Sequence, residues 1–137
     1  MLVLGLVASL GLGATSLSPF ARASDRSFIG HYTAVHTSSS GLALVDGWDV
    51  SSCGGGCAEI TGQNIFFRMH LNDDRWTMAF GNDTVCPDGT QVRDSQETYY
   101  SLDANTLRGT VLVTYTKPVC GDDLTGQTFM HSLVLSR

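Results

Sequence analysis

IFFRMHLNDDRWTMAF, residues 65–80, is the stretch of sequence that decides the fold. It contains two runs in which apolar side chains occupy every second position, separated by Asn72-Asp73-Asp74. A period of two places successive side chains on opposite faces of a strand, so each run is predicted to be a strand with one buried face. Asn and Asp side chains hydrogen-bond the nearby backbone and favour turns, so the two runs are expected to form a hairpin.

The same alternation recurs along the rest of the chain. Strands are predicted over residues 28–35, 44–52, 65–71, 75–80, 97–102, 110–116 and 129–136, with turns at 72–74, 87–89, 103–105 and 121–123. Seven or eight short strands joined by tight turns predict an all-β fold, a small antiparallel meander barrel with two disulfides. The alternative is a β-sandwich of the immunoglobulin type. It is less favoured because neither tryptophan lies between cysteines at the spacing of those domains.

Length and charge exclude several classes of protein. The 137 residues allow a single domain, and the formal net charge is −5. An acidic domain without a run of Lys or Arg is not expected to bind nucleic acid. A hydrophobic content of 42% is enough to build a core, which argues against intrinsic disorder.

The N-terminal segment has the character of an export signal. Residues 1–17 are apolar or small, and they are followed by Pro19 and by Ala21-Arg22-Ala23, a triplet of the kind that signal peptidase accepts. We expect residues 1–23 to be a signal peptide and residues 24–137 to be one secreted, extracytoplasmic β-domain with no membrane span. The alternative is that the segment is retained as an N-terminal anchor.

The cysteines agree with export. An even number of cysteines in a small exported domain predicts disulfides, and four cysteines allow three pairings. We favour Cys53–Cys57, because three glycines between them let the backbone turn tightly, together with Cys86–Cys120. A zinc site is the disfavoured alternative, since this spacing is not that of a zinc knuckle.

Several short motifs resemble those of one family. The motifs are Trp48-x-Val50-x-x-Cys53-Gly54-x-Gly56-Cys57-Ala58, Cys86-Pro87-Asp88-Gly89, Gly30-x-Tyr32-Thr33, Leu107-x-Gly109 and Cys120-Gly121, together with Trp76. In these the chain resembles a family of small mycobacterial (actinobacterial) secreted proteins, disulfide-containing β-domains of unknown function. Similar modules form extracytoplasmic parts of mycobacterial envelope proteins. The resemblance implies location, cysteine pairing and β-fold, and it supplies no catalytic residue.

The sequence offers little catalytic chemistry. No nucleophile sits in a G-x-S-x-G elbow, and the Asp pairs at 73–74 and 122–123 do not fit a calcium-loop frame. His31 and His36 are five residues apart and are expected to point to opposite faces of one strand. His131 lies on an apolar strand face and is interpreted as a hydrogen-bonded interior histidine. We therefore expect no enzyme activity, no metal site and no cofactor.

Aromatic side chains are the remaining candidates for a binding site. Ligand contacts are predicted for Tyr32, Trp48, Phe67, Trp76 and Tyr115. Phe66 and Tyr99 fall on the opposite strand faces and are expected to be exposed. The favoured function is a monomeric, non-catalytic binding or sensing domain of the bacterial cell envelope, with a small apolar ligand in or at the mouth of the barrel. The alternative is a structural or protein–protein interaction module with a filled core, whose partner is an envelope protein.

Overall fold

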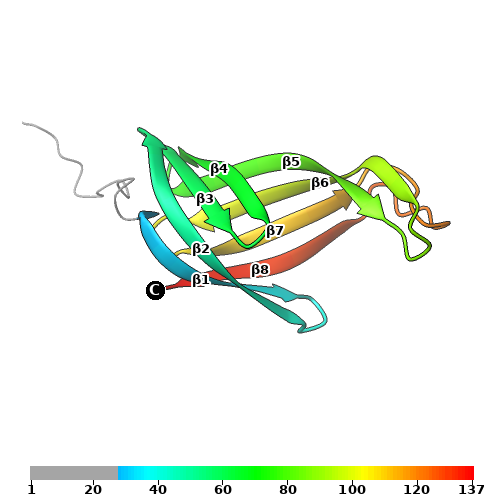
Figure 1. Cartoon of the computed structure of the whole chain (residues 1–137), viewed down its shortest axis with the longest axis horizontal. Coiled ribbons are helices and arrows are strands. Elements are labelled where there is room, and N and C mark those ends of the chain that lie inside the picture. The colour runs from blue at the N-terminus through cyan, green and yellow to red at the C-terminus, as the bar shows by residue number, and fades with distance from the viewer. Residues whose placement is uncertain (1–27) are drawn as a thin grey trace, which may run out of the picture.

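The computed structural model describes residues 28–137 as an eight-stranded antiparallel β-barrel (Figure 1). Each strand pairs with the next in the chain, and β8 closes the ring by pairing with β1 from Thr33↔Ser136 to Ser38↔His131. The strands are β1 (Gly30–Ser38), β2 (Ala43–Gly54), β3 (Cys57–Gly62), β4 (Ile65–Asn72), β5 (Arg75–Val85), β6 (Gln91–Asp103), β7 (Arg108–Tyr115) and β8 (Thr128–Ser136).

The predicted meander barrel is therefore confirmed, and the sandwich alternative is wrong. Two parts of the strand prediction fall short. β3 was not predicted as a strand, and β5 and β6 run well beyond the predicted segments 75–80 and 97–102. The predicted turns at 72–74, 87–89, 103–105 and 121–123 all lie outside the cores of the strands, between successive elements.

Both predicted disulfides are present. Cys53–Cys57 spans the turn between β2 and β3, where Gly54 and Gly56 adopt φ of 124° and 69°, values that suit glycine. Cys86–Cys120 ties the end of β5 to the connection between β7 and β8. Two disulfides fit an oxidising, extracytoplasmic compartment. The predicted signal peptide, residues 1–23, lies outside the described residues. Within residues 28–137, no helix has the length and hydropathy needed to cross a membrane.

One end of the barrel is filled with side chains. Phe28 packs on Trp76, with ring centroids 4.9 Å apart, and on Tyr32 at 5.9 Å. The aliphatic residues that complete this end are Ala58, Ile60, Met69, Leu102, Ala104, Leu133 and Leu135, all buried. Large aromatic side chains remove the most surface from water, so Phe28 and Trp76 account for much of this core.

The other end of the barrel is not closed evenly, because the strands differ in length. The β3–β4 hairpin ends at the pair Gly62↔Ile65, whereas β5 and β6 stay paired out to Val85↔Gln91. Along their shared seam, β4 and β5 form only three pairs, from Asn72↔Arg75 to His70↔Thr77. Beyond this seam the wall of the barrel has a gap on one side, between the β3–β4 hairpin and β5. We call this half of the barrel the open end.

Candidate functional site

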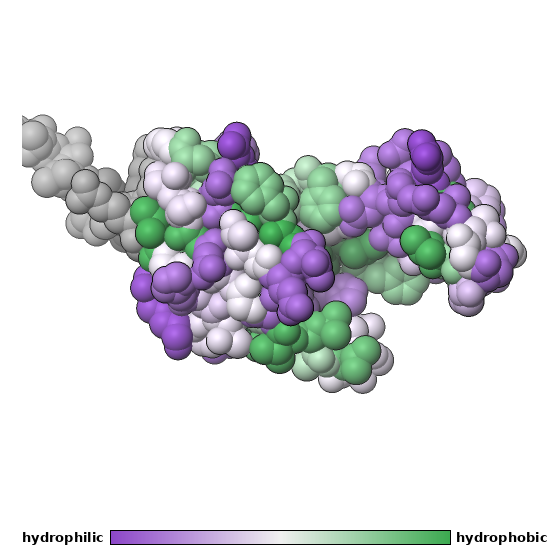
Figure 2. Space-filling view, in the orientation of Figure 1, coloured by the Kyte–Doolittle hydropathy of each residue, from purple (hydrophilic) through white to green (hydrophobic). Residues whose placement is uncertain are grey.

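The open end holds a hollow inside the barrel, with a volume of about 280 Å³. Figure 2 shows a deep recess between the main body and the far ends of β5 and β6, with hydrophobic residues over the β1–β2 hairpin at its lower edge. The volume lies just below the usual range for ligand pockets, about 300–1,000 Å³. The lining residues come from six strands: His36, Leu44, Phe80, Asn82, Gln96, Thr98, Tyr100, Val111, Val113 and His131.

A cluster of rings forms the floor of this hollow: Tyr100, Phe80 and His36 line it, and two further rings pack beneath them. Phe67 lies edge-on to Trp48 at 5.4 Å and beside Tyr100 at 5.3 Å. Phe80 stacks on Tyr100 at 6.1 Å. These separations are within the 4.5–7 Å typical of favourable aromatic pairs. The His36 ring packs on the same cluster, 5.9 Å from Trp48 and edge-on to Tyr100 at 6.1 Å.

The wall opposite His36 is polar. Asn82 donates a hydrogen bond to the Thr98 hydroxyl at 3.2 Å, and Gln96 donates to the Thr84 hydroxyl at 3.0 Å. The Thr84 and Ser95 hydroxyls are 2.6 Å apart. These side chains face inward from β5 and β6, so this wall can offer hydrogen-bonding atoms to a molecule in the hollow.

Two titratable groups that line the hollow, His36 and Tyr100, have displaced pKa values. Burial lowers the pKa of His36, the nearby His131 lowers it further, and Asp46 opposes both. Burial raises the pKa of Tyr100, and the charge of Asp46 raises it further. The His36 imidazole is thus held neutral near pH 7, and Tyr100 keeps its hydroxyl proton.

Two nitrogens of the floor lack hydrogen-bond partners among the described residues, His36 Nε2 and Trp48 Nε1. Buried polar atoms without a partner are uncommon and costly. Both atoms are buried, so a molecule bound in the hollow would not meet these nitrogens. The same lack of a partner holds for Trp76 Nε1 at the filled end.

A second opening, the side window, leads toward the hollow through the gap between β4 and β5. Its volume is about 480 Å³. It shares Phe80 and Asn82 with the hollow, so the two spaces are neighbours on either side of these side chains. The other lining residues are Asn64, Ile65, Phe66, Phe67 and Met78.

The five predicted ligand-contacting aromatics are divided between the two ends of the barrel. Trp48 and Phe67 pack against each other beneath the hollow, where Trp48 is only 1% exposed, and Phe67 lines the side window. Tyr115 lies farther out on β7, edge-on to Phe129 at 5.7 Å, on a recess at the rim. Tyr32 and Trp76 lie in the filled end, where Trp76 is fully buried and the Tyr32 hydroxyl accepts a hydrogen bond from Arg137. The structure therefore gathers three of the five at the open end.

The predictions for the histidines and for the exposed aromatic residues can each be compared with the structure. His31 faces outward and pairs with Asp49, whereas His36 faces inward, as predicted. His131 faces inward too, but no hydrogen bond to its ring joins it to another residue of the described chain. Phe66 and Tyr99 are exposed as predicted, at 64% and 43%.

Phe66 and Tyr99 do not form one patch. Phe66 lies at the side window, and Tyr99 lines a groove on the outside of the barrel across β5, β6 and β7. This outer groove is lined by Ala79, Gly81, Glu97, Leu112 and Thr114 as well.

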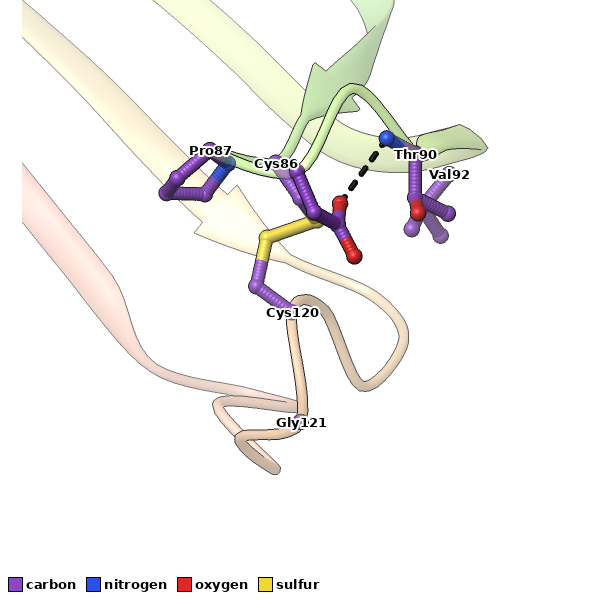
Figure 3. A pocket seen from close by; sticks show the side chains of 7 residues that line it. Cys86, Pro87, Thr90, Val92, Cys120 and Gly121 are labelled. Carbon is purple, nitrogen blue, oxygen red and sulfur yellow. Dashed lines mark hydrogen bonds between the residues drawn. A yellow bond between two sulfur atoms is a disulfide. The ribbon is translucent and has the colours of Figure 1, made fainter.

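The recess beside the Cys86–Cys120 disulfide is a weaker candidate (Figure 3). Its only carboxylate, Asp88, accepts a hydrogen bond from the Thr90 backbone N–H at 2.9 Å. This bond lowers the pKa of Asp88. The carboxylate thus closes its own turn, and the recess is explained by the path of the chain around the disulfide.

None of the ten residues that line the hollow is among the five predicted ligand contacts, and its ring-bearing residues His36, Phe80 and Tyr100 were all missed as site residues. Each lies on the inward row that alternation predicts, so the signal for their face was present. What alternation does not give is how far along the barrel axis each side chain sits, because that depends on strand register.

No group of three or more metal-ligating side chains comes together within residues 28–137. Comparison of the chain with family models, with curated proteins and with solved structures finds no match.

Proposed function

We propose that the protein is an exported, non-catalytic binding domain of the bacterial cell envelope, and that it takes a small apolar molecule into the open end of the barrel. The observation that carries this proposal is the hollow itself. Its floor is aromatic, its opposite wall is polar, and it opens at the barrel mouth, with the side window adjacent. Ligand sites in proteins combine these features, a mostly apolar surface with a few polar groups that fix orientation.

The two tryptophans offer an internal reporter for this proposal. Trp48 lies in the floor of the hollow, and Trp76 lies in the filled end. The Trp76→Phe variant therefore leaves the indole nearer the expected ligand, and the Trp48→Phe variant leaves the indole deeper in the filled end. Addition of the uncharged probe N-phenyl-1-naphthylamine is expected to quench the emission of Trp48 more strongly than that of Trp76, because energy transfer to the probe weakens with distance.

A blocking variant and a matched control make the test specific. Val113 points into the hollow, and its neighbour Leu112 points to the outer groove. Val113→Phe is expected to abolish probe binding, and Leu112→Phe is expected to retain it, with circular dichroism confirming that both variants fold. Probe binding that survives in Val113→Phe, or that disappears only in Leu112→Phe, would show that the hollow is not the site.

A second candidate function, docking of an envelope protein, rests on a different observation. Leu42 and Val45, at the β1–β2 hairpin, are 67% and 68% exposed, and such apolar side chains are often covered by a partner. A photo-crosslinking residue at position 45 should then give an adduct with an envelope protein of the host, whereas one at position 112 should not. Equal labelling from both positions would remove this candidate.

A further inference from the structure

A single carboxylate borders the hollow. Leu44, Asp46 and Trp48 form one inward row of β2, because side chains two residues apart share a strand face. Leu44 lines the hollow, and Trp48 belongs to its floor. Asp46 lies between them, is half-buried, and must therefore flank the same space.

The end of the β3–β4 hairpin fixes the position of this carboxylate. A Cβ atom on Gly62 would stand 2.8 Å from Asp46 Oδ2 and 2.7 Å from the Ile65 side chain. The carboxylate thus reaches the tip of the hairpin, where the side window begins. Only the absence of a side chain at Gly62 leaves room for it.

Asp46 has no salt-bridge partner among the described residues, where the ion pairs are His31–Asp49 and Arg68–Glu59. None of the residues that line the hollow or the side window is a Lys, Arg, Asp or Glu. The inside of the open end therefore carries one negative charge once the histidines are neutral. That charge acts on the His36 and Tyr100 side chains that line the hollow.

We propose that the open end prefers a ligand with a cationic head, an amine or a quaternary ammonium group, on an apolar body. This inference rests on the proposed function and names the class of its ligand. A cation gains binding energy from both elements of the site, since it pairs with the carboxylate and is attracted to the ring faces of Tyr100 and Phe80. An anionic apolar molecule of the same size is repelled by the Asp46 carboxylate and should bind more weakly.

The test compares three molecules with a straight alkyl chain of seven or eight carbons and different head groups: octyltrimethylammonium, octanol and octanoate. Each displaces N-phenyl-1-naphthylamine from the protein at pH 8, above the ordinary pKa of histidine of about 6.5. Octyltrimethylammonium is expected to bind about fivefold more tightly than octanol, a size typical of one partly exposed ion pair with a cation–π contact. Octanoate is expected to bind more weakly than octanol.

Two variants on the same strand assign the effect to Asp46. Asp46→Asn, or Asp46→Ser if the first does not fold, should bring the cation and octanol to equal affinity. Asp49→Asn removes the same charge from the outer face of β2 and should keep the fivefold preference, which controls for the net charge of the protein.

The outcomes separate the two proposals. Equal binding of all three molecules to the wild type, or a preference that survives in Asp46→Asn, overturns the cation preference and leaves the apolar site standing. Failure of the probe and of octanol to bind at all overturns the proposed function instead.

Discussion

Removal of the two disulfides should cost unequal amounts of stability, in proportion to the loops they close. Cys86–Cys120 joins residues 34 apart, and Cys53–Cys57 joins residues 4 apart. In the chain-entropy account, a cross-link stabilises a protein by restricting its unfolded chain, and the effect grows with the logarithm of loop length. Loops of these sizes give about 3.8 kcal/mol for the long cross-link and about 1.9 kcal/mol for the short one at 25 °C.

The measurement is urea unfolding of two double variants, Cys86→Ala/Cys120→Ala and Cys53→Ala/Cys57→Ala, beside the wild type. The first is expected to lose about twice as much unfolding free energy as the second, with similar dependence on urea. Against a typical total of 5–15 kcal/mol, the larger loss brings a small domain close to unfolding. An equal loss from both pairs, or a larger loss from the short one, would refute the loop-entropy reasoning for this barrel.

Three further outcomes are expected. The Gly109→Ala variant should have a much lower urea midpoint of unfolding than the wild type, because the new Cβ would lie 1.9 Å from the backbone oxygen of Ser101. The control Gly47→Ala places its Cβ within 4 Å of no atom beyond its chain neighbours and should leave the midpoint nearly unchanged. Equal midpoints for the two variants would contradict the predicted clash at Gly109. The pKa of His36 is lowered in the folded protein, so as the pH falls the unfolded chain takes up this proton first. The neutral, buried His36 therefore costs no stability above pH 6.5, and the folded state loses stability as the pH falls below that value. The His36→Phe variant should show a flatter pH dependence of the unfolding free energy between pH 7 and 5, and an unchanged slope would count against this reasoning. Residues 65–69 of β4 face the gap beyond the short seam, whereas β3 is paired with a strand on both sides. The amide hydrogens of residues 65–69 should therefore exchange with solvent faster than those of β3. Mass spectrometry of peptides after deuterium labelling measures this difference, and equal protection would argue that the gap is closed in solution.

The strands that the sequence predicted are those with an apolar inner row. In β4 and the first half of β5, Phe67 and Trp76 mark the buried face, and both lie inside the barrel. The outer half of β5 was missed because its inward residues, Asn82 and Thr84, are polar and bond to β6 within the wall. A period-two pattern is visible only where the interior is apolar.

The candidate site was predicted in part for a related reason. The alternating pattern correctly predicted that Trp48 and Trp76 face the barrel interior, but it gave no reason to place them in different parts of that interior. The barrel separates them along its axis, since each strand is displaced relative to its neighbour as the sheet closes. The short β3, which leaves Asp46 beside an opening, has no signal in alternation because its inner row holds only Ala58, Ile60 and Gly62.

The pairing of β1 with β8 brings both ends of the described chain to the filled end. Gly30 lies beside the Arg137 side chain, and the C-terminus leaves the barrel away from the far ends of β5 and β6 (Figure 1). A linker attached at either end would therefore hold the barrel by its closed base and point the hollow outward. Immobilised on a sensor surface in this way, the protein would present its open end to the solution.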